Sequence, residues 1–139
     1  MKNSLLTLTL LFVTLTLFAQ EKTGKSITVT IHQISNNNGQ VLVSLHTQDT
    51  FMKDPGIQNL KSTIADGKVR LSFENVPAGE YAILAMHDEN DNGTMDFESN
   101  GMPIESYGMS GNDMTMGPPT FSSAKFTVTD TDLEFNIQF

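Results

Sequence analysis

The sequence predicts an all-β fold, an antiparallel β-sandwich of about six to seven strands with one long loop between strands. Several short segments alternate apolar and polar residues with period two and are rich in Val, Ile, Thr and Phe, as half-buried strands are. No segment shows a convincing helical apolar pattern. The strands are therefore expected to pack against each other and not against helices.

The first two predicted strands cover residues 26–34 and 40–46, where β-branched and Leu residues repeat on one face. Between them, residues 35–39 read Ser-Asn-Asn-Asn-Gly. Asn and Gly tolerate a positive φ, so these two strands are expected to form a hairpin.

The later strands show the same alternation at residues 68–73, 81–87, 125–129 and 133–139. The strand at 81–87 is apolar on both faces and should be central in its sheet. Residues 47–63 lack a clear period, and near residues 57–64 they are expected to hold a short extra strand or a helical turn. Residues 88–120 form the long loop; its Met and aromatic residues predict that it packs against the sheet, and a loop of this length is usually functional or disordered.

The N-terminus has the pattern of a secretory signal peptide, with Lys2 before an apolar run at residues 5–18 and Ala19 at the cleavage site. This run is shorter than the ~20 residues that a membrane-spanning helix needs. We therefore expect a signal peptide at residues 1–19, a single domain at residues 20–139, no membrane span after cleavage, and a secreted or periplasmic protein. The chain has no Cys, so disulfides do not stabilise it.

Charge disfavours two classes of partner. Without Lys2 the chain has seven basic and 16 acidic residues, a formal charge of −9, and residues 71–124 contain no Lys or Arg. Nucleic acids and anionic membranes would repel such a surface. A bound cation would relieve the charge, although an acidic solvated face explains the net charge equally well.

The segment before the central strand reads Pro77-Ala78-Gly79-Glu80-Tyr81. This Pro-x-Gly-x-Tyr turn should point its Tyr into the core. It resembles the turn of transthyretin-like (prealbumin-like) sandwiches, an Ig-like architecture, and of calcium-binding B-type repeats of surface adhesins. Those repeats also carry an Asp-x-Asn-x-Asn-Gly loop after a strand.

A series of short motifs extends the resemblance over nearly the whole chain. They are Gly79-Glu80-Tyr81-Ala82, His87-Asp88-Glu89-Asn90 with Asn92-Gly93, Gly101-Met102-Pro103-Ile104-Glu105 with Tyr107-Gly108, and Gly117-Pro118-Pro119 with Phe121 and Ala124. In this order they resemble the exported bacterial proteins known as domain of unknown function 2141. That resemblance implies export and a β-sandwich and carries no established activity.

The stretch from Asp88 to Glu98 suggests a calcium site. Its oxygen-bearing side chains have the alternating spacing of a cation-binding loop, with Gly93 at the turn; the candidate ligands are Asp88, Asn90, Asn92, Thr94, Asp96 and Glu98. The twelfth position of an EF-hand loop, normally a bidentate Glu, is Ser99, and Glu98 comes one residue early. Binding should therefore be weak, with a dissociation constant of roughly 10⁻⁴ to 10⁻³ M. The alternative is a metal-free turn in which these side chains cap their own backbone.

The sequence favours a non-enzymatic, monomeric binding module at the cell envelope, with an envelope protein, a peptide or a glycan as partner. Two alternatives remain open. One is a polysaccharide hydrolase that uses His87 and nearby carboxylates such as Asp88 and Glu105. The other is copper handling by a thioether cluster, formed by Met95, Met102, Met109, Met114 and Met116. No motif specifies a nucleophile, since the sequence around Ser110 lacks the spacing of a nucleophile elbow.

Overall fold

The computed structural model describes residues 23–111 and 118–139 and contains eight strands and one short helix in that part of the chain. The elements are β1 (Lys25–His32), β2 (Gln40–His46), β3 (Gln58–Ser62), β4 (Val69–Val76), β5 (Gly79–Asp88), β6 (Tyr107–Met109), α1 (Phe121–Ala124), β7 (Phe126–Val128) and β8 (Leu133–Gln138). The all-β prediction is confirmed.

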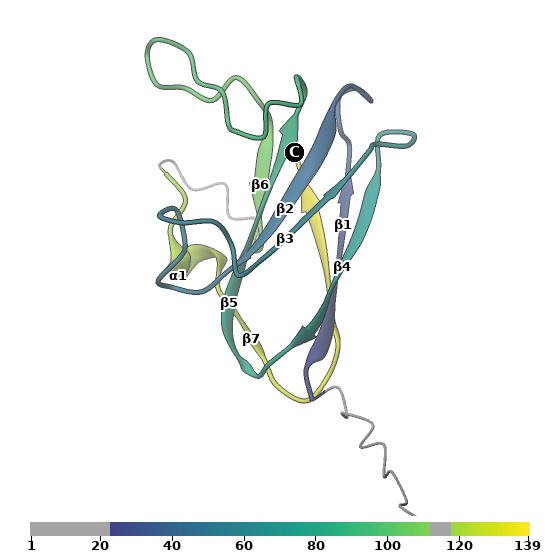
Figure 1. Ribbon diagram of the computed structural model, residues 1–139, viewed down its shortest axis with the longest axis vertical. Coiled ribbons are helices and arrows are strands. Elements are labelled where there is room, and N and C mark those ends of the chain that lie inside the picture. Colours follow the sequence, from purple (N-terminus) through teal and green to yellow (C-terminus); the bar gives the residue numbers. More distant parts are fainter. Residues whose placement is uncertain (1–22, 112–117) are drawn as a thin grey trace, which may run out of the picture.

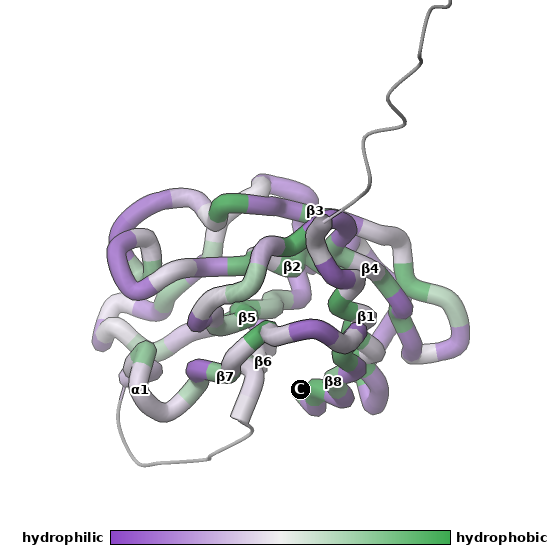
Figure 2. The backbone as a smooth tube through the Cα atoms, turned by 90° about the horizontal axis from the view of Figure 1, so that it is seen from below, coloured by the Kyte–Doolittle hydropathy of each residue, from purple (hydrophilic) through white to green (hydrophobic). Residues whose placement is uncertain are grey.

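The strands form two sheets that pack face to face (Figure 1). One sheet has the order β4-β1-β8 and the other the order β3-β2-β5-β6, with β7 also paired to β5. Figure 2 looks roughly along the strands and separates the two layers. The described strand pairs are antiparallel except β1 and β8, which run parallel from Ile27↔Leu133 to His32↔Gln138.

The core lies between the sheets and follows from the period-two alternation. Every second residue of β1 and β2 is almost fully buried, and the largest fully buried side chain is Phe73 of β4. Tyr81 is 7% exposed, so it points inward as predicted from the Pro-x-Gly-x-Tyr turn. β5 lies between β2 and β6, which confirms the prediction that it is a central strand.

The predicted hairpin between the first two strands is wrong. β1 pairs with β4 and β8, whereas β2 pairs with β3 and β5 in the other sheet. Residues 33–39 carry the chain across the sandwich, helped by positive φ at Gln33 and Gly39. The apolar faces of β1 and β2 therefore face each other across the core from different sheets. Alternation of apolar and polar residues looks the same whether two strands pair in one sheet or lie in opposite sheets.

Of the two segments without a clear strand period, one holds the short extra element that the sequence predicts, and the other has more regular structure than predicted. The extra element near residues 57–64 is the strand β3, which pairs with β2. The long loop contains β6, a three-residue strand on the edge of β5, and α1 follows it. The signal-peptide prediction and Met114 and Met116 fall on residues outside the described part of the chain. No helix within the described residues has the length and apolarity to span a membrane.

Candidate functional site

The Asp88 loop, residues 88–106, leaves the end of β5 and returns as β6. At its base β6 pairs with β5, with Leu84 opposite Met109 and Met86 opposite Tyr107. Ile104 N also donates to Asp96 O at 2.9 Å, which closes the loop a second time. The loop lies at one end of the sandwich, above the end of β5 (Figure 1).

Asp88 anchors the start of the loop. Its side chain is fully buried and accepts three hydrogen bonds: from Asn92 N to Oδ1 at 3.0 Å, from Gly93 N to Oδ2 at 2.9 Å and from Gln40 Nε2 to Oδ2 at 3.1 Å. A buried carboxylate needs such donors because it has lost its water. Asp88 thus folds the Asn92-Gly93 turn onto the end of β5.

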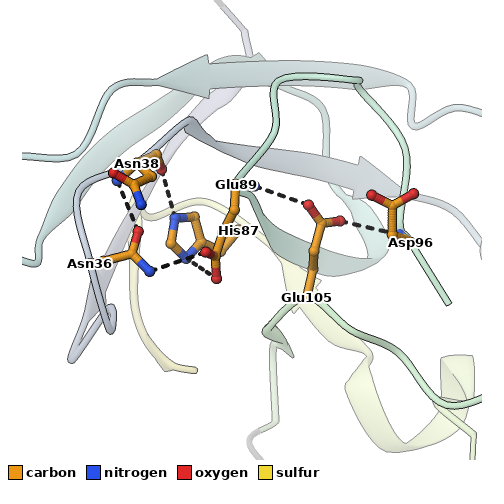
Figure 3. A network of polar contacts seen from close by, with 6 residues as sticks. All are labelled: Asn36, Asn38, His87, Glu89, Asp96 and Glu105. Atoms are coloured by element: carbon orange, nitrogen blue, oxygen red, sulfur yellow. Dashed lines mark hydrogen bonds and ion pairs between the residues drawn. The ribbon is translucent and has the colours of Figure 1, made fainter. Parts of the chain in front are cut away.

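Glu105 is the second anchor, which sequence spacing did not single out as a structural residue. Its carboxylate is 5% exposed and accepts from Glu89 N at 3.0 Å and from Asp96 N at 3.2 Å (Figure 3). One side chain from the end of the loop therefore holds two backbone segments from its beginning and middle. The only sequence signal was its place in the motif series 101–105.

Three of the predicted ligands meet in one place. Asn90 Nδ2 donates to Asp96 Oδ2 at 2.6 Å, and Asn92 Nδ2 donates to both oxygens of Asp96 at 3.0 and 3.1 Å. The two amide oxygens accept backbone N–H groups, Asn90 Oδ1 from Asn92 and Asn92 Oδ1 from Thr94. These are the backbone-capping turns of the alternative interpretation, and Gly93 and Asp91 supply positive φ.

The other three predicted ligands, Asp88, Thr94 and Glu98, make their hydrogen bonds to groups other than the Asp96 carboxylate. Glu98 is exposed and accepts from Asn100 Nδ2 at 3.1 Å. The Thr94 hydroxyl donates to Asn92 Oδ1 at 3.1 Å. Across the residues that the structure describes, no three His, Asp or Glu side chains form a metal-binding group, and the convergence consists of two amides and one carboxylate.

His87 ties the loop to the β1–β2 connection. It is fully buried, and its Nε2 donates to Asn38 O at 2.8 Å, while Nδ1 lies 3.8 Å from Glu89 Oε1 without a hydrogen-bond partner (Figure 3). Asn36 Nδ2 donates to the other oxygen of Glu89 at 3.1 Å. Gly39 completes this contact, because a Cβ there would lie 2.0 Å from Asp88 O.

An open groove of about 1080 Å³ runs along the outer face of the second sheet. Its floor includes Leu42, Leu84 and Met86 of β2 and β5, and one side is formed by residues of the Asp88 loop, among them Met95 and Phe97. Met52, Pro55 and Lys61 also line the groove. The prediction that the loop packs down is only partly correct, since Phe97 is 57% and Met102 is 62% exposed.

His46 also lines the groove and is 5% exposed. Its Nδ1 lies 3.3 Å from Thr50 Oγ1, and its ring meets Phe51 edge to face. Burial lowers the pKa of His46 below 6.5, although a hydrogen bond with the backbone of Thr50 acts in the opposite direction. The imidazole is therefore held as a neutral side chain at neutral pH.

The three described methionines of the proposed copper cluster do not share one position. Met109 is 9% exposed in a small core with Phe51, Ala82 and Ala124, whereas Met95 and Met102 line the groove.

Ser110 has a structural role. Its Oγ accepts from Ile83 N at 2.8 Å and donates to Ala124 O at 2.6 Å.

A family model described as "Uncharacterized protein conserved in bacteria (DUF2141)" matches residues 29–136. The chain belongs to this DUF2141 family. The family membership expected from the motif series is thereby confirmed. Comparison with curated proteins and with solved structures gave no match.

The DUF2141 match begins within β1 and ends within β8, so it takes in both sheets, both anchors of the Asp88 loop and the groove. The loop and the groove are therefore parts of the DUF2141 domain itself.

Proposed function

We propose that this DUF2141 domain is a non-catalytic binding module of the bacterial cell envelope, which holds an apolar segment of a partner in the groove beside the Asp88 loop. The observation that carries this proposal is the groove itself, whose lining combines Leu42 and Leu84 with the exposed side chains of Phe97 and Met102. Contiguous exposed apolar surface of this kind is typical of interaction sites. The envelope location rests on the signal pattern at residues 1–19.

The burial and hydrogen bonding of His87, Asp88 and Glu105 favour a binding role over hydrolysis. His87 is fully buried, and the carboxylates of Asp88 and Glu105 are occupied by loop N–H donors. A general acid or base must reach a proton on its substrate. These three residues instead hold the loop against the sheet.

The binding proposal is tested with the neutral apolar dye Nile red and two variants on one loop. Phe97→Ser removes an exposed side chain from the groove lining, and Ile104→Ser removes one that is 62% exposed and lies outside it. Dye fluorescence should rise on binding to the wild type and to Ile104→Ser and fall clearly for Phe97→Ser. Equal dye binding by all three proteins would refute the groove as the site.

We further propose that calcium stabilises the Asp88 loop. The support comes from Asp96, on whose carboxylate the side chains of Asn90 and Asn92 converge. Both amides now turn Nδ2 toward Asp96, so calcium binding would require them to turn their Oδ1 atoms, which accept backbone N–H groups, toward the ion. Within the described residues, none of the loop carboxylates at Asp91, Asp96 and Glu98 pairs with Lys or Arg. A cation at this point would offset that charge.

Thermal unfolding tests the calcium proposal. With a dissociation constant near 10⁻³ M, 10 mM calcium should add about 1.4 kcal/mol to the stability of the folded state, and EDTA should remove this gain. Asp96→Asn should lose the calcium shift, whereas Asp130→Asn, an exposed carboxylate outside the loop, should retain it. Asp88→Ala discriminates poorly, because it also removes an acceptor of three hydrogen bonds. An identical melting temperature with calcium and with EDTA would disprove the site.

A further inference from the structure

His87 carries a buried ring nitrogen that the fold leaves without a hydrogen bond. The side chain is fully buried, and its Nδ1 has no hydrogen-bond partner. Across the residues that the structure describes, no other buried side-chain nitrogen or oxygen atom is in this state. Burial without a partner is unfavourable for a polar atom, so this nitrogen is a candidate for binding a ligand from outside the chain.

The hydrogen bond of the other ring nitrogen determines what Nδ1 can bind. Nε2 lies 2.8 Å from the carbonyl oxygen of Asn38, which can only accept, so Nε2 carries the hydrogen. In the neutral imidazole, Nδ1 then has a free lone pair. Metal-binding histidines have this arrangement, in which the second ring nitrogen donates to a backbone carbonyl and fixes the orientation of the ring.

A carboxylate faces the free lone pair. Glu89 follows His87 by two residues, and its Oε1 lies 3.8 Å from Nδ1 (Figure 3). Asn36 Nδ2 donates to Oε2 of the same carboxylate at 3.1 Å and so orients it. Because Asn36 and Asn38 both belong to the connection between β1 and β2, this one segment positions the imidazole and the carboxylate together.

The separation of the two groups suits one metal ion between them. A distance of 3.8 Å is too long for a hydrogen bond. Zinc binds nitrogen and oxygen at about 2.0–2.2 Å, so two donors of a tetrahedral zinc site lie about 3.4 Å apart. The Glu89 side chain is 40% exposed, so it is free to move the few tenths of an ångström that this requires. Its exposure also gives water access to the remaining coordination positions.

We infer that His87 Nδ1 and the Glu89 carboxylate bind one Zn²⁺ or a similar divalent transition-metal ion, with water as the other ligands. Imidazole with carboxylate suits such ions, whereas calcium and magnesium prefer sites made only of oxygen. The site is therefore distinct from the calcium position proposed at Asp96 and from the groove. A bound ion would fasten the start of the Asp88 loop to the buried end of β5.

Calorimetric titration with Zn²⁺ in excess calcium tests this inference, because calcium then occupies the oxygen-only sites. The wild type should bind one ion. Glu89→Gln removes the charged ligand and keeps an oxygen that can accept from Asn36, and it should weaken zinc binding at least about tenfold. Asn36→Ser, which removes the donor that orients Glu89, should weaken it as well. Glu98→Gln, at another exposed Glu of the same loop, should bind zinc like the wild type.

The ring ¹⁵N resonances of the histidines identify the nitrogen ligand. Zn²⁺ should shift the Nδ1 resonance of His87 and leave those of His32 and His46 in place. His87 is kept in every protein compared, because replacing a fully buried ring would disturb the packing as well.

Three outcomes would overturn the His87–Glu89 site. They are no zinc binding by the wild type, the wild-type zinc affinity in Glu89→Gln, and a zinc shift confined to His32 or His46. The second and third would show adventitious binding to surface groups only. None of the three affects dye binding in the groove or the calcium-dependent melting temperature, so the proposed functions are tested separately.

Discussion

Glu105 accepts the backbone N–H of Glu89 at 3.0 Å, although the two residues are 16 positions apart at opposite ends of the Asp88 loop. The same carboxylate accepts the N–H of Asp96 through its other oxygen. The conformation of the loop thus depends on a single buried side chain as well as on its own turns. This side chain also sets the position of Met95 and Phe97, which line the groove on either side of Asp96.

Replacing Glu105 should therefore destabilise the domain through the loop. Glu105→Ala leaves two backbone donors without their charged acceptor and should lower the free energy of unfolding by about 2 kcal/mol. Urea denaturation measures this change. Glu98→Ala is the matched control, because Glu98 is an exposed Glu of the same loop, and it should change stability by less than about 0.5 kcal/mol. Equal effects of the two substitutions would show that Glu105 does not anchor the loop.

Substitution of Ala for Gly should reduce the stability of the fold by different amounts at two glycines with positive φ. Gly93 has φ +78 and open space where a Cβ would stand, so Gly93→Ala should cost about 1–2 kcal/mol, the cost of a left-handed backbone. Gly39 has φ +62, and a Cβ there would lie 2.0 Å from Asp88 O. Gly39→Ala must also displace backbone, so its loss in thermal stability should be clearly larger. Similar losses of stability in the two variants would indicate that the backbone near Gly39 and Asp88 can shift at little cost in free energy.

Ser110 should behave as a structural residue. Its buried hydroxyl joins Ile83 of β5 to Ala124 of α1, and Ser110→Ala leaves both backbone groups without this partner. The expected loss is about 2 kcal/mol in chemical denaturation. Ser122→Ala, at an exposed position of the same helix, should cost less than about 0.5 kcal/mol. A Ser110→Ala protein as stable as the wild type would contradict this role.

The pKa of His46 predicts a loss of stability in acid. Because burial lowers its pKa below 6.5 in the folded state, the unfolded chain binds a proton more readily once the pH falls below about 6.5. Stability should be fully present above that pH and should decrease as the pH falls toward the lowered folded-state pKa. Urea midpoints at pH 7.5 and 5.5 measure the decrease, which should be smaller in His46→Asn. His32→Asn, which removes a different imidazole, should retain the wild-type decrease; the proposed origin is wrong if His46→Asn retains it too.

The strands were predictable because each carries its signal locally. Alternation identifies the buried face of β1, β2, β4, β5 and β8, and the two apolar faces of β5 identify a central strand. Pairing partners were not predictable in the same way. The connection at residues 33–39 suits a hairpin as well as a crossing between sheets, and the choice depends on contacts of β1 with β4 and β8, far along the chain.

The site was predictable only where its side chains act on near neighbours. Asp88, Asn90 and Asn92 reveal a tight turn because their partners lie two to five residues away. Glu105 has its partners nine and 16 residues away and shows no local pattern. The groove is formed by residues from β2, β3, β5 and the loop, so no single segment indicates it.

The parallel pairing of β1 and β8 fixes where attachments to this domain would lie. β1 starts at the end of the sandwich remote from the Asp88 loop, whereas β8 ends beside the end of β1, at the same end as Asp88 (Figure 1). A label or surface linker joined before Lys25 would leave the groove open to its ligand. The same linker joined after Phe139 would emerge next to the loop and compete for space with whatever approaches it.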